Sequence, residues 1–348
     1  MGQRKKEAAV KLNKTAAKLR GEQILYGAFD PLYFAKRSQH IFFQFLFYSL
    51  VIGLCFSILY PLLKIIPVVF SDFSDLGNPD VIWVPQKASA LSFTAAIRIG
   101  FGNGSTMLLT LLYCAAITII QIMISAFAGY SLARVNFPLR GLVMILVVIT
   151  IIVPPQSLLI SQYLHFKHFD VLGLVSMISG KTYDLVNKPY TLYILALTGF
   201  GVKQSIFVFI FRQFFISLPN ELEEAAHIDG CGFYKTFFKI VFPTAVPAIT
   251  TVAALAFVWN YGDTYYTGYF HPDGPYMANT LSQLFNPVNV PWLLSVIQRW
   301  YSLPSVSNFT FDAVKYAAAI LFLSPLLVLY FIVQKKIVQN FERSGIVG

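Results

Sequence analysis

The chain has 348 residues, of which 56% are hydrophobic and only 12% are charged, and its mean hydropathy is +0.64. About a quarter of the residues in an average soluble domain are charged, so this composition indicates a protein that lies in lipid. The net charge of +10 does not predict nucleic-acid binding, because nine of the 26 Lys and Arg residues lie in the first 37 residues. The three cysteines have no spacing typical of a zinc site or a disulfide framework.

Residues 1–40 form a basic segment that we interpret as a cytoplasmic N-terminal tail. The apolar run after it is too long for the core of a signal peptide, and no small-residue cleavage site follows. We therefore expect this tail to be retained.

Six segments are long and apolar enough to cross a bilayer, which takes about 20 residues per helix. Backbone polar groups inside lipid must be hydrogen-bonded within the segment, so these runs are expected to be helices. They are Ile41–Ile66, Thr106–Tyr130, Gly141–Leu164, Thr191–Ile216, Pro243–Tyr261 and Ala313–Val333. The sequence thus predicts an all-α membrane protein with a transmembrane domain over residues 41–337 and a cytoplasmic C-terminal tail over residues 338–348. Kinks are expected at the prolines, and Lys203 indicates a break in the fourth span.

The distribution of basic residues predicts the orientation of the spans. With the N-terminus inside, 17 of the 26 Lys and Arg residues lie on the cytoplasmic side and six on the outer side. Positive charge is enriched in cytoplasmic loops, so both termini are expected inside. The segment between the fourth and fifth spans is then cytoplasmic.

That segment, residues 219–243, has the pattern of a short helix–turn–helix. Asn220 and Glu223 are spaced as a helix N-cap and capping box, and Gly230 suits the left-handed end of a helix. One helical face is shared by Leu222, Ala225, Ala226 and Asp229. A second amphipathic segment follows, and Pro243 is expected to open the fifth span. The physics alone fits either a docking element for another protein or an interfacial helix that only connects two spans.

The same segment resembles the EAA loop of binding-protein-dependent ABC importer permeases. The positions that carry this resemblance are Glu224, Ala225, Ala226, Asp229, Gly230, Ile240 and Pro243. Phe242 departs conservatively from the usual Leu. Further stretches are similar to carbohydrate-type permeases, in particular the shorter permease half of the maltose transporter: Ala128–Arg134, Val153–Gln156, Trp83–Pro85, Phe211–Phe215 and Trp259–Asn260.

The resemblance implies that this chain pairs with a second permease subunit above two ABC ATPase subunits, and that one of these ATPase subunits docks on the seven positions above. It also implies a solute-binding protein outside and a location in a bacterial cytoplasmic membrane. The chain has no phosphate-binding Gly-x-x-x-x-Gly-Lys-Ser/Thr motif, so it is not expected to be an enzyme. It is expected to bind no cofactor, with ATP and Mg²⁺ held by the partner ATPase.

Polar residues in apolar runs are candidates for the substrate path, because they are costly in lipid. These candidates are Gln121, Trp259, Asn260, Asp263 and Tyr265. Aromatic rings and amides would suit a sugar, but hydrogen bonds between helices explain the same residues. His165, His168 and Asp170 give only a weak indication of a metal site.

Three alternatives remain open. An ABC permease could carry a non-sugar solute such as a peptide or an ion. An ion-coupled secondary transporter is disfavoured, because the six spans contain no Asp or Glu. A membrane enzyme would need a clustered acid, base or metal constellation, and none stands out.

Overall fold

A computed structural model describes residues 31–80, 83–170, 173–284, 286–303 and 305–345. Most of the predicted basic tail therefore lies outside the described residues. The chain forms two compact units, Met1–Ile66 and Pro67–Gly348, which are considered separately.

The first unit consists, in its described part, of helix α2 (Pro31–Val69), which ends just beyond the unit. Ile41–Val69 of this helix is apolar enough to cross a membrane. Every side chain from Ile41 to Leu59 is exposed, so this helix is apolar all round. A helix with that property needs lipid or another protein around it.

In its described residues the second unit has helices joined by turns and loops, two isolated bridges, Ser71↔Ala88 and Phe169↔Tyr183, and no strand. Its elements are α3 (Leu91–Ala95), η1 (Ala96–Gly100), η2 (Gly102–Gly104), α4 (Ser105–Arg134), α5 (Arg140–Ile152), α6 (Pro155–Lys167), α7 (Leu174–Ser179), α8 (Pro189–Leu197), α9 (Gln204–Ser217), α10 (Glu221–Ile228), α11 (Phe233–Thr236), η3 (Phe237–Val241), α12 (Phe242–Thr244), α13 (Val246–Tyr261), α14 (Tyr265–Phe270), α15 (Met277–Leu284), η4 (Pro287–Asn289), α16 (Val290–Tyr301) and α17 (Asn308–Gly345).

The described residues contain three single helices able to cross a membrane, or up to five spans if each bent pair counts as one. The single helices are Ile41–Val69, Ser105–Arg134 and Asn308–Lys335, which match the first, second and sixth predicted spans. Helix α17 continues to Gly345 without a break at the predicted end of the domain.

Two predicted spans are bent pairs of helices. The third is α5 and α6, which meet at 105°, and the fifth is a pair bent by 78°, Phe233–Thr244 and Val246–Tyr261. Pro154 and Pro155 explain the first bend, because proline removes a backbone donor and clashes with the preceding turn. Pro243 does not open the fifth span as predicted, since it lies within α12, whereas Pro247 lies in the first turn of α13.

The fourth predicted span is not one helix. It is divided into α8 and α9 by residues 198–203. The expected break at Lys203 is confirmed, because its φ of 54° is left-handed and cannot continue a right-handed helix. Neither α8 nor α9 is long enough to cross a bilayer alone.

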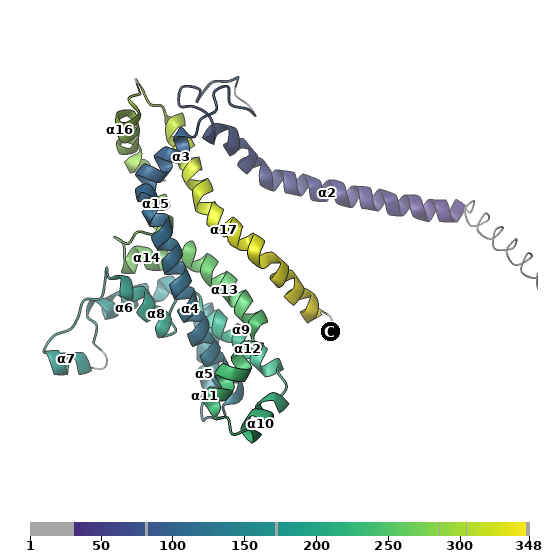
Figure 1. Cartoon of the computed structure of the whole chain (residues 1–348), viewed down its shortest axis with the longest axis vertical. Coiled ribbons are helices and arrows are strands. Elements are labelled where there is room, and N and C mark those ends of the chain that lie inside the picture. Colours follow the sequence, from purple (N-terminus) through teal and green to yellow (C-terminus); the bar gives the residue numbers. More distant parts are fainter. Residues whose placement is uncertain (1–30, 81–82, 171–172, 285, 304, 346–348) are drawn as a thin grey trace, which may run out of the picture. The chain divides into compact units, whose positions relative to one another are not determined.

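Helix α4 is the centre of the second unit, where it packs along α9 and α13 (Figure 1). The core between these helices is aliphatic and aromatic, with Phe207, Phe211 and Phe215 of α9 fully buried. The backbones of α4 and α9 lie close together at Gly129. A Cβ atom there would lie 2.8 Å from the Phe211 Cβ and 2.9 Å from the Arg212 backbone N. Only glycine permits this crossing without displacing the backbone.

Side-chain amides bind the backbone groups that the break between α8 and α9 leaves free. The Gly201 N–H donates to Gln204 Oε1 at 3.0 Å, and Gln204 Nε2 donates to the Ala196 carbonyl at 2.8 Å. Gln121 Nε2 of α4 donates to the Val202 carbonyl at 3.2 Å. In lipid, a broken helix is tolerated when such groups find partners.

Replacing Gln204 with leucine is therefore expected to lower the free energy of unfolding by about 1–3 kcal/mol, because the part-buried Gly201 N–H loses its partner and the Ala196 carbonyl keeps only the Gly199 N–H at 3.4 Å. SDS titration of the chain in mixed micelles would measure this. Gln213→Leu is the matched control, since Gln213 lies exposed on the same helix. Equal effects of the two substitutions would show that the amide network does not stabilise the break.

Candidate docking site on residues 219–243

Helix α10 begins after Asn220, as predicted, but the predicted capping box is wrong. No side chain caps the helix. Asn220 Oδ1 instead accepts a hydrogen bond from Arg134 Nη1, and Glu223 Oε1 forms an ion pair with Arg134 Nε at 3.0 Å. The guanidinium of Arg134, at the end of α4, thus occupies both side chains that would have closed the box. Charge-assisted hydrogen bonds are stronger than neutral ones, which explains the outcome.

The end of α10 is as predicted at Gly230. Its φ is 75°, and the Gly230 N–H donates to the His227 carbonyl at 3.0 Å. The Cys231 N–H donates to the Ala226 carbonyl at 2.9 Å. These two bonds form a Schellman motif, which ends a helix and fixes the direction of the chain after it.

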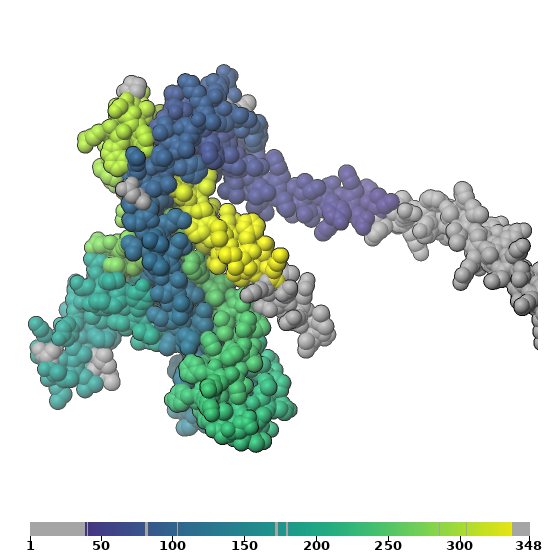
Figure 2. All heavy atoms as spheres, viewed as in Figure 1, coloured from purple at the N-terminus to yellow at the C-terminus, as the bar shows by residue number. Residues whose placement is uncertain are grey.

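The second arm of the segment is α11, η3 and α12, which pack against α4 through aromatic rings. Phe127 lies 5.5 Å from Phe237 and Tyr130 lies 5.2 Å from Phe233, measured between ring centroids. Tyr234 stacks on Phe127 at 6.0 Å. Such aromatic pairs add to the stabilisation from burial. The whole segment forms one end of the second unit, green in Figure 2.

The exposed surface of α10 differs from the predicted face. Ala226 is 1% exposed and faces the protein interior, so its contact with a partner could only be indirect. Ala225 and Asp229 are exposed, as are Glu224, Gly230 and Pro243, while Ile240 is half-buried. Ile228 is 87% exposed, which is unusual for isoleucine outside lipid, and it was absent from the predicted face. The exposure of Ile228 depends on which side of α10 packs against the protein. Helical periodicity alone does not predict that side.

Two residues of the predicted substrate path are brought together. Asn260 Nδ2 of α13 donates to Gln121 Oε1 of α4 at 2.7 Å, and both side chains are buried. Gln121 also binds the break between α8 and α9. The third residue, Trp259, stacks on Phe207 with ring centroids 5.5 Å apart. These contacts fit hydrogen bonding and packing between helices.

The remaining two candidates lie just beyond α13. Asp263 accepts hydrogen bonds from the Thr267 N–H at 2.8 Å and the Tyr266 N–H at 3.2 Å, so it caps α14. Burial raises the pKa of this carboxyl, and the two N–H groups act in the opposite direction. The Tyr265 hydroxyl is buried and has no hydrogen-bond partner among the described residues. Asn260 Oδ1 is likewise buried without a hydrogen-bond partner among the described residues, so two of the five candidates retain a polar atom for another ligand.

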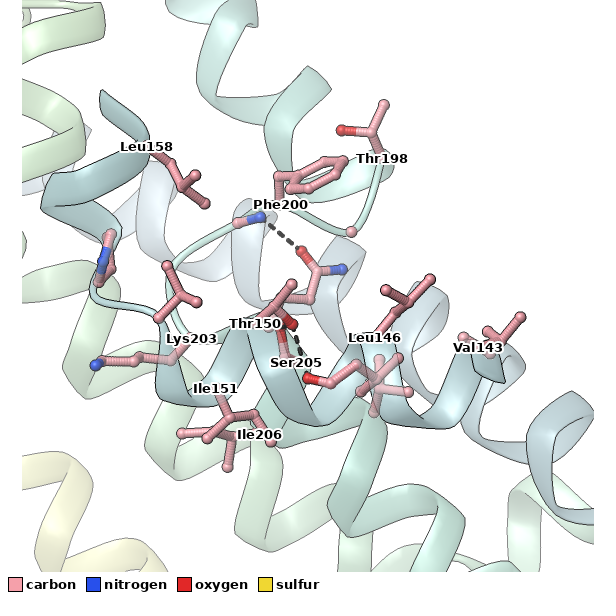
Figure 3. A pocket seen from close by; sticks show the side chains of 18 of the residues that line it. Val143, Leu146, Thr150, Ile151, Leu158, Thr198, Phe200, Lys203, Ser205 and Ile206 are labelled. Carbon is pink, nitrogen blue, oxygen red and sulfur yellow. Dashed lines mark hydrogen bonds between the residues drawn. The ribbon is translucent and has the colours of Figure 1, made fainter. Parts of the chain in front are cut away.

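A pocket of about 480 Å³ lies between α4, α5, α6 and α9, beside residues 198–203 (Figure 3). Aliphatic side chains such as Leu146 and Ile151 line most of it. Thr150 Oγ1 of α5 donates to Ser205 Oγ of α9 at 2.7 Å. The Lys203 side chain points away from these hydroxyl groups. None of the predicted substrate-path residues lines this pocket.

The described residues contain no group of three or more His, Cys, Asp and Glu side chains placed to hold a metal ion. Asp170 accepts from the Val175 N–H at 2.9 Å, near the start of α7. The His165 ring packs against Phe166 and Phe169. Asp170 and His165, two of the three residues suggested as a metal site, thus make contacts within the protein.

The family described as binding-protein-dependent transport system inner membrane components matches residues 121–343. The chain belongs to this family. The match includes α4 from Gln121 onward, the break between α8 and α9, and the whole of residues 219–243. The resemblance stated from the sequence is thereby confirmed, and membrane-transport permeases of this kind are not enzymes.

Several permeases of this family are similar to the chain. The alpha-glucoside transport system permease protein AglG of Rhizobium meliloti is 33% identical over 49% of this chain and 41% of its own length. The osmoprotective compounds uptake permease protein GgtD of Synechocystis is 31% identical over 55% of this chain and 59% of its own length. The sn-glycerol-3-phosphate transport system permease protein UgpE of Yersinia pestis is 29% identical over 61% and 70%. The chain thus spans about half the length of the first two.

A solved structure shows the same fold. It is the crystal structure of a bacterial ABC transporter involved in the import of the acidic polysaccharide alginate, with a TM-score of 0.60. The likeness covers 86% of this chain and 97% of the other, at 18% identity.

Proposed function

We propose that this chain is a transmembrane permease subunit of an ATP-driven ABC importer, and that α10 docks a separate ATPase. The observation that supports this most is the exposed surface of α10 in a chain of the permease family. Its exposed positions include Ala225, where a partner could approach closely, and Ile228, which offers an apolar contact. An apolar side chain that enters a partner's groove is a typical anchor of helix-in-groove binding.

The proposed arrangement has six membrane crossings with both termini inside. α8 and α9 then count as one broken span. The two bent pairs, α5 with α6 and Phe233–Thr244 with α13, count as one span each. The excess of basic residues on one side supports this orientation. A second permease subunit would complete the path, a solute-binding protein would deliver substrate outside, and two ATPase subunits would hold ATP and Mg²⁺. The location would be a bacterial cytoplasmic membrane.

The proposed substrate is a sugar, an oligosaccharide or a related polyol. The names of similar permeases support this class, since one refers to alpha-glucosides and another to glycerol 3-phosphate. The alternative within the family is a non-sugar solute, which the name of the osmoprotective compounds uptake permease supports.

The test is to express the tagged chain with the products of its neighbouring genes and to reconstitute what co-purifies into liposomes. We expect an ATPase to co-purify. Uptake of a labelled oligosaccharide mixture should require ATP on the side of the membrane where the ATPase lies, and the binding protein on the opposite side. Uptake that an ion gradient drives without ATP would instead establish a secondary transporter. ATP-dependent uptake of a non-sugar solute alone would retain the importer and reject the sugar.

A further inference from the structure

Helix α10 has little of its own surface buried in the protein. Ala226 is the one buried residue among its eight. The helix packs on α11 and η3, which belong to the same segment. A short helix with so few buried contacts would unfold locally or shift when a partner displaces it, because little opposes local opening. A contact that joins α10 to a long helix would oppose such opening.

Arg134 makes that contact from the last turn of α4. Its Nη1 donates to Asn220 Oδ1, its Nη2 donates to the Leu218 carbonyl at 2.5 Å, and its Nε pairs with Glu223 Oε1. The two charged side chains of this ion pair are only 14% and 16% exposed. One planar guanidinium thus joins the end of α4 to residues on both sides of the start of α10. Lysine could not reproduce this, since its single ammonium lacks the forked geometry.

The three partners lie where the chain would otherwise bend. Leu218 follows the last residue of α9, and Asn220 precedes the first residue of α10. Glu223 lies in the first turn of α10, beside two further carboxylates, Glu221 and Glu224. A cation at this position also reduces repulsion within that acidic turn. Arg134 therefore bridges the joint between α9 and α10.

We propose that Arg134 is a positioning residue that fixes α10 to α4, so that displacement of α10 moves the long helix and does not bend the joint at residues 218–220. This inference rests on the proposed function of α10 as a docking helix. Force on α10 reaches α4 by two routes, the Arg134 contacts at one end and the aromatic packing of α11 and η3 at the other. The Arg134 contacts join α10 to α4 directly, and Tyr130 of α4 also interacts with Glu223 of α10.

Arg140 provides a matched control on the same end of α4. Its guanidinium donates to the Leu132 and Ala133 carbonyls, both at 2.8 Å, and to Asn136 Oδ1 at 3.1 Å. It therefore closes the turn between α4 and α5 through three hydrogen bonds, none of them to α10, whereas Arg134 makes two hydrogen bonds and one ion pair. Arg134→Lys and Arg140→Lys remove equivalent forked contacts and keep the charge.

The first measurement is hydrogen exchange of the full chain in nanodiscs, without partners. We expect Arg134→Met to speed the exchange of the α10 amides about tenfold and Arg134→Lys to have an intermediate effect, because charged hydrogen bonds that oppose local opening are lost. Arg140→Lys should leave α10 unchanged. The double variant Arg134→Glu with Glu223→Arg should restore part of the protection through the reversed ion pair. Unchanged exchange in Arg134→Met, or faster exchange throughout the second unit, would overturn the proposal.

The second measurement uses the complex with its co-purified ATPase. Arg134→Met is expected to lower the number of solute molecules imported per ATP hydrolysed severalfold, while the ATPase still co-purifies. A ratio equal to the wild type would overturn the role in transmission. Should no ATPase co-purify with the wild type, the docking function fails, and with it the role in transmission. The exchange result would still decide whether Arg134 fixes α10.

Discussion

Replacing Gly129 with alanine is expected to cost at least about 3 kcal/mol of folding free energy, and replacing it with leucine to prevent accumulation of folded protein. The added Cβ would lie 2.8 Å from the Phe211 Cβ, 2.9 Å from the Arg212 N and 3.0 Å from the Val208 carbonyl oxygen. Two of these atoms belong to the α9 backbone, which cannot turn aside as a flexible side chain can. The helices would have to separate along the buried phenylalanines, and that packing would be lost.

Gly141→Ala is the control for this prediction. Gly141 lies in the first turn of α5, and a Cβ atom there meets nothing within 4 Å. Alanine at that position should be neutral or slightly stabilising, because it restricts the unfolded chain. SDS titration in mixed micelles would compare the two variants. A Gly129→Ala protein as stable as Gly141→Ala would show that α4 and α9 do not cross as closely as described.

Ile228→Asp is expected to weaken binding of the ATPase to this chain about 100-fold or more. Ile228 is 87% exposed, so its replacement removes no packing within the chain. Buried in a partner's groove, it would be a central apolar anchor, and an aspartate there would be an unpaired buried charge. Binding of the purified ATPase to the chain in nanodiscs, measured by interferometry, would give the dissociation constants.

Leu139→Asp is the matched control for the docking prediction. Leu139 is 70% exposed in the turn between α4 and α5, outside residues 219–243. The same change there should leave binding unaltered. Equal binding by wild type and Ile228→Asp would remove Ile228 from the docking surface, and equal loss in both variants would point to a wider interface that includes the turn.

The sequence predicted the long uninterrupted helices well, because their apolar composition has few other physical solutions in lipid. It also predicted the bend at Pro154 and Pro155, because the effect of proline on a helix is local. The fourth span was predicted only in part. Its two halves read as one apolar run, and only Lys203 indicated the break. Gln204, beside the break, and Gln121 of α4, far away in sequence, together make the break tolerable, and neither was predicted to do so.

In the candidate site, too, features set by neighbouring residues were predictable and features set by residues distant in sequence were not. The end of α10 at Gly230 was predictable, because a left-handed residue and its hydrogen bonds are local. The start of α10 was not, because Asn220 is bound by Arg134, 86 residues earlier in the chain. The buried side of α10 likewise depended on packing, so Ala226 was expected on the docking surface and Ile228 was not. Periodicity shows that a helix has faces, but it does not show which one is covered.

The amide network at the break between α8 and α9 also bears on the permeability barrier of the membrane. If this break lies within the bilayer, free carbonyl and N–H groups there would attract water, and a file of water conducts protons. The Ala196 and Val202 carbonyls and the Gly201 N–H are already bonded to amide side chains. Water would have to displace those amides to gain entry. At these three groups the interrupted span offers water no free hydrogen-bond partner, which opposes a file of water and the loss of the proton gradient through the break.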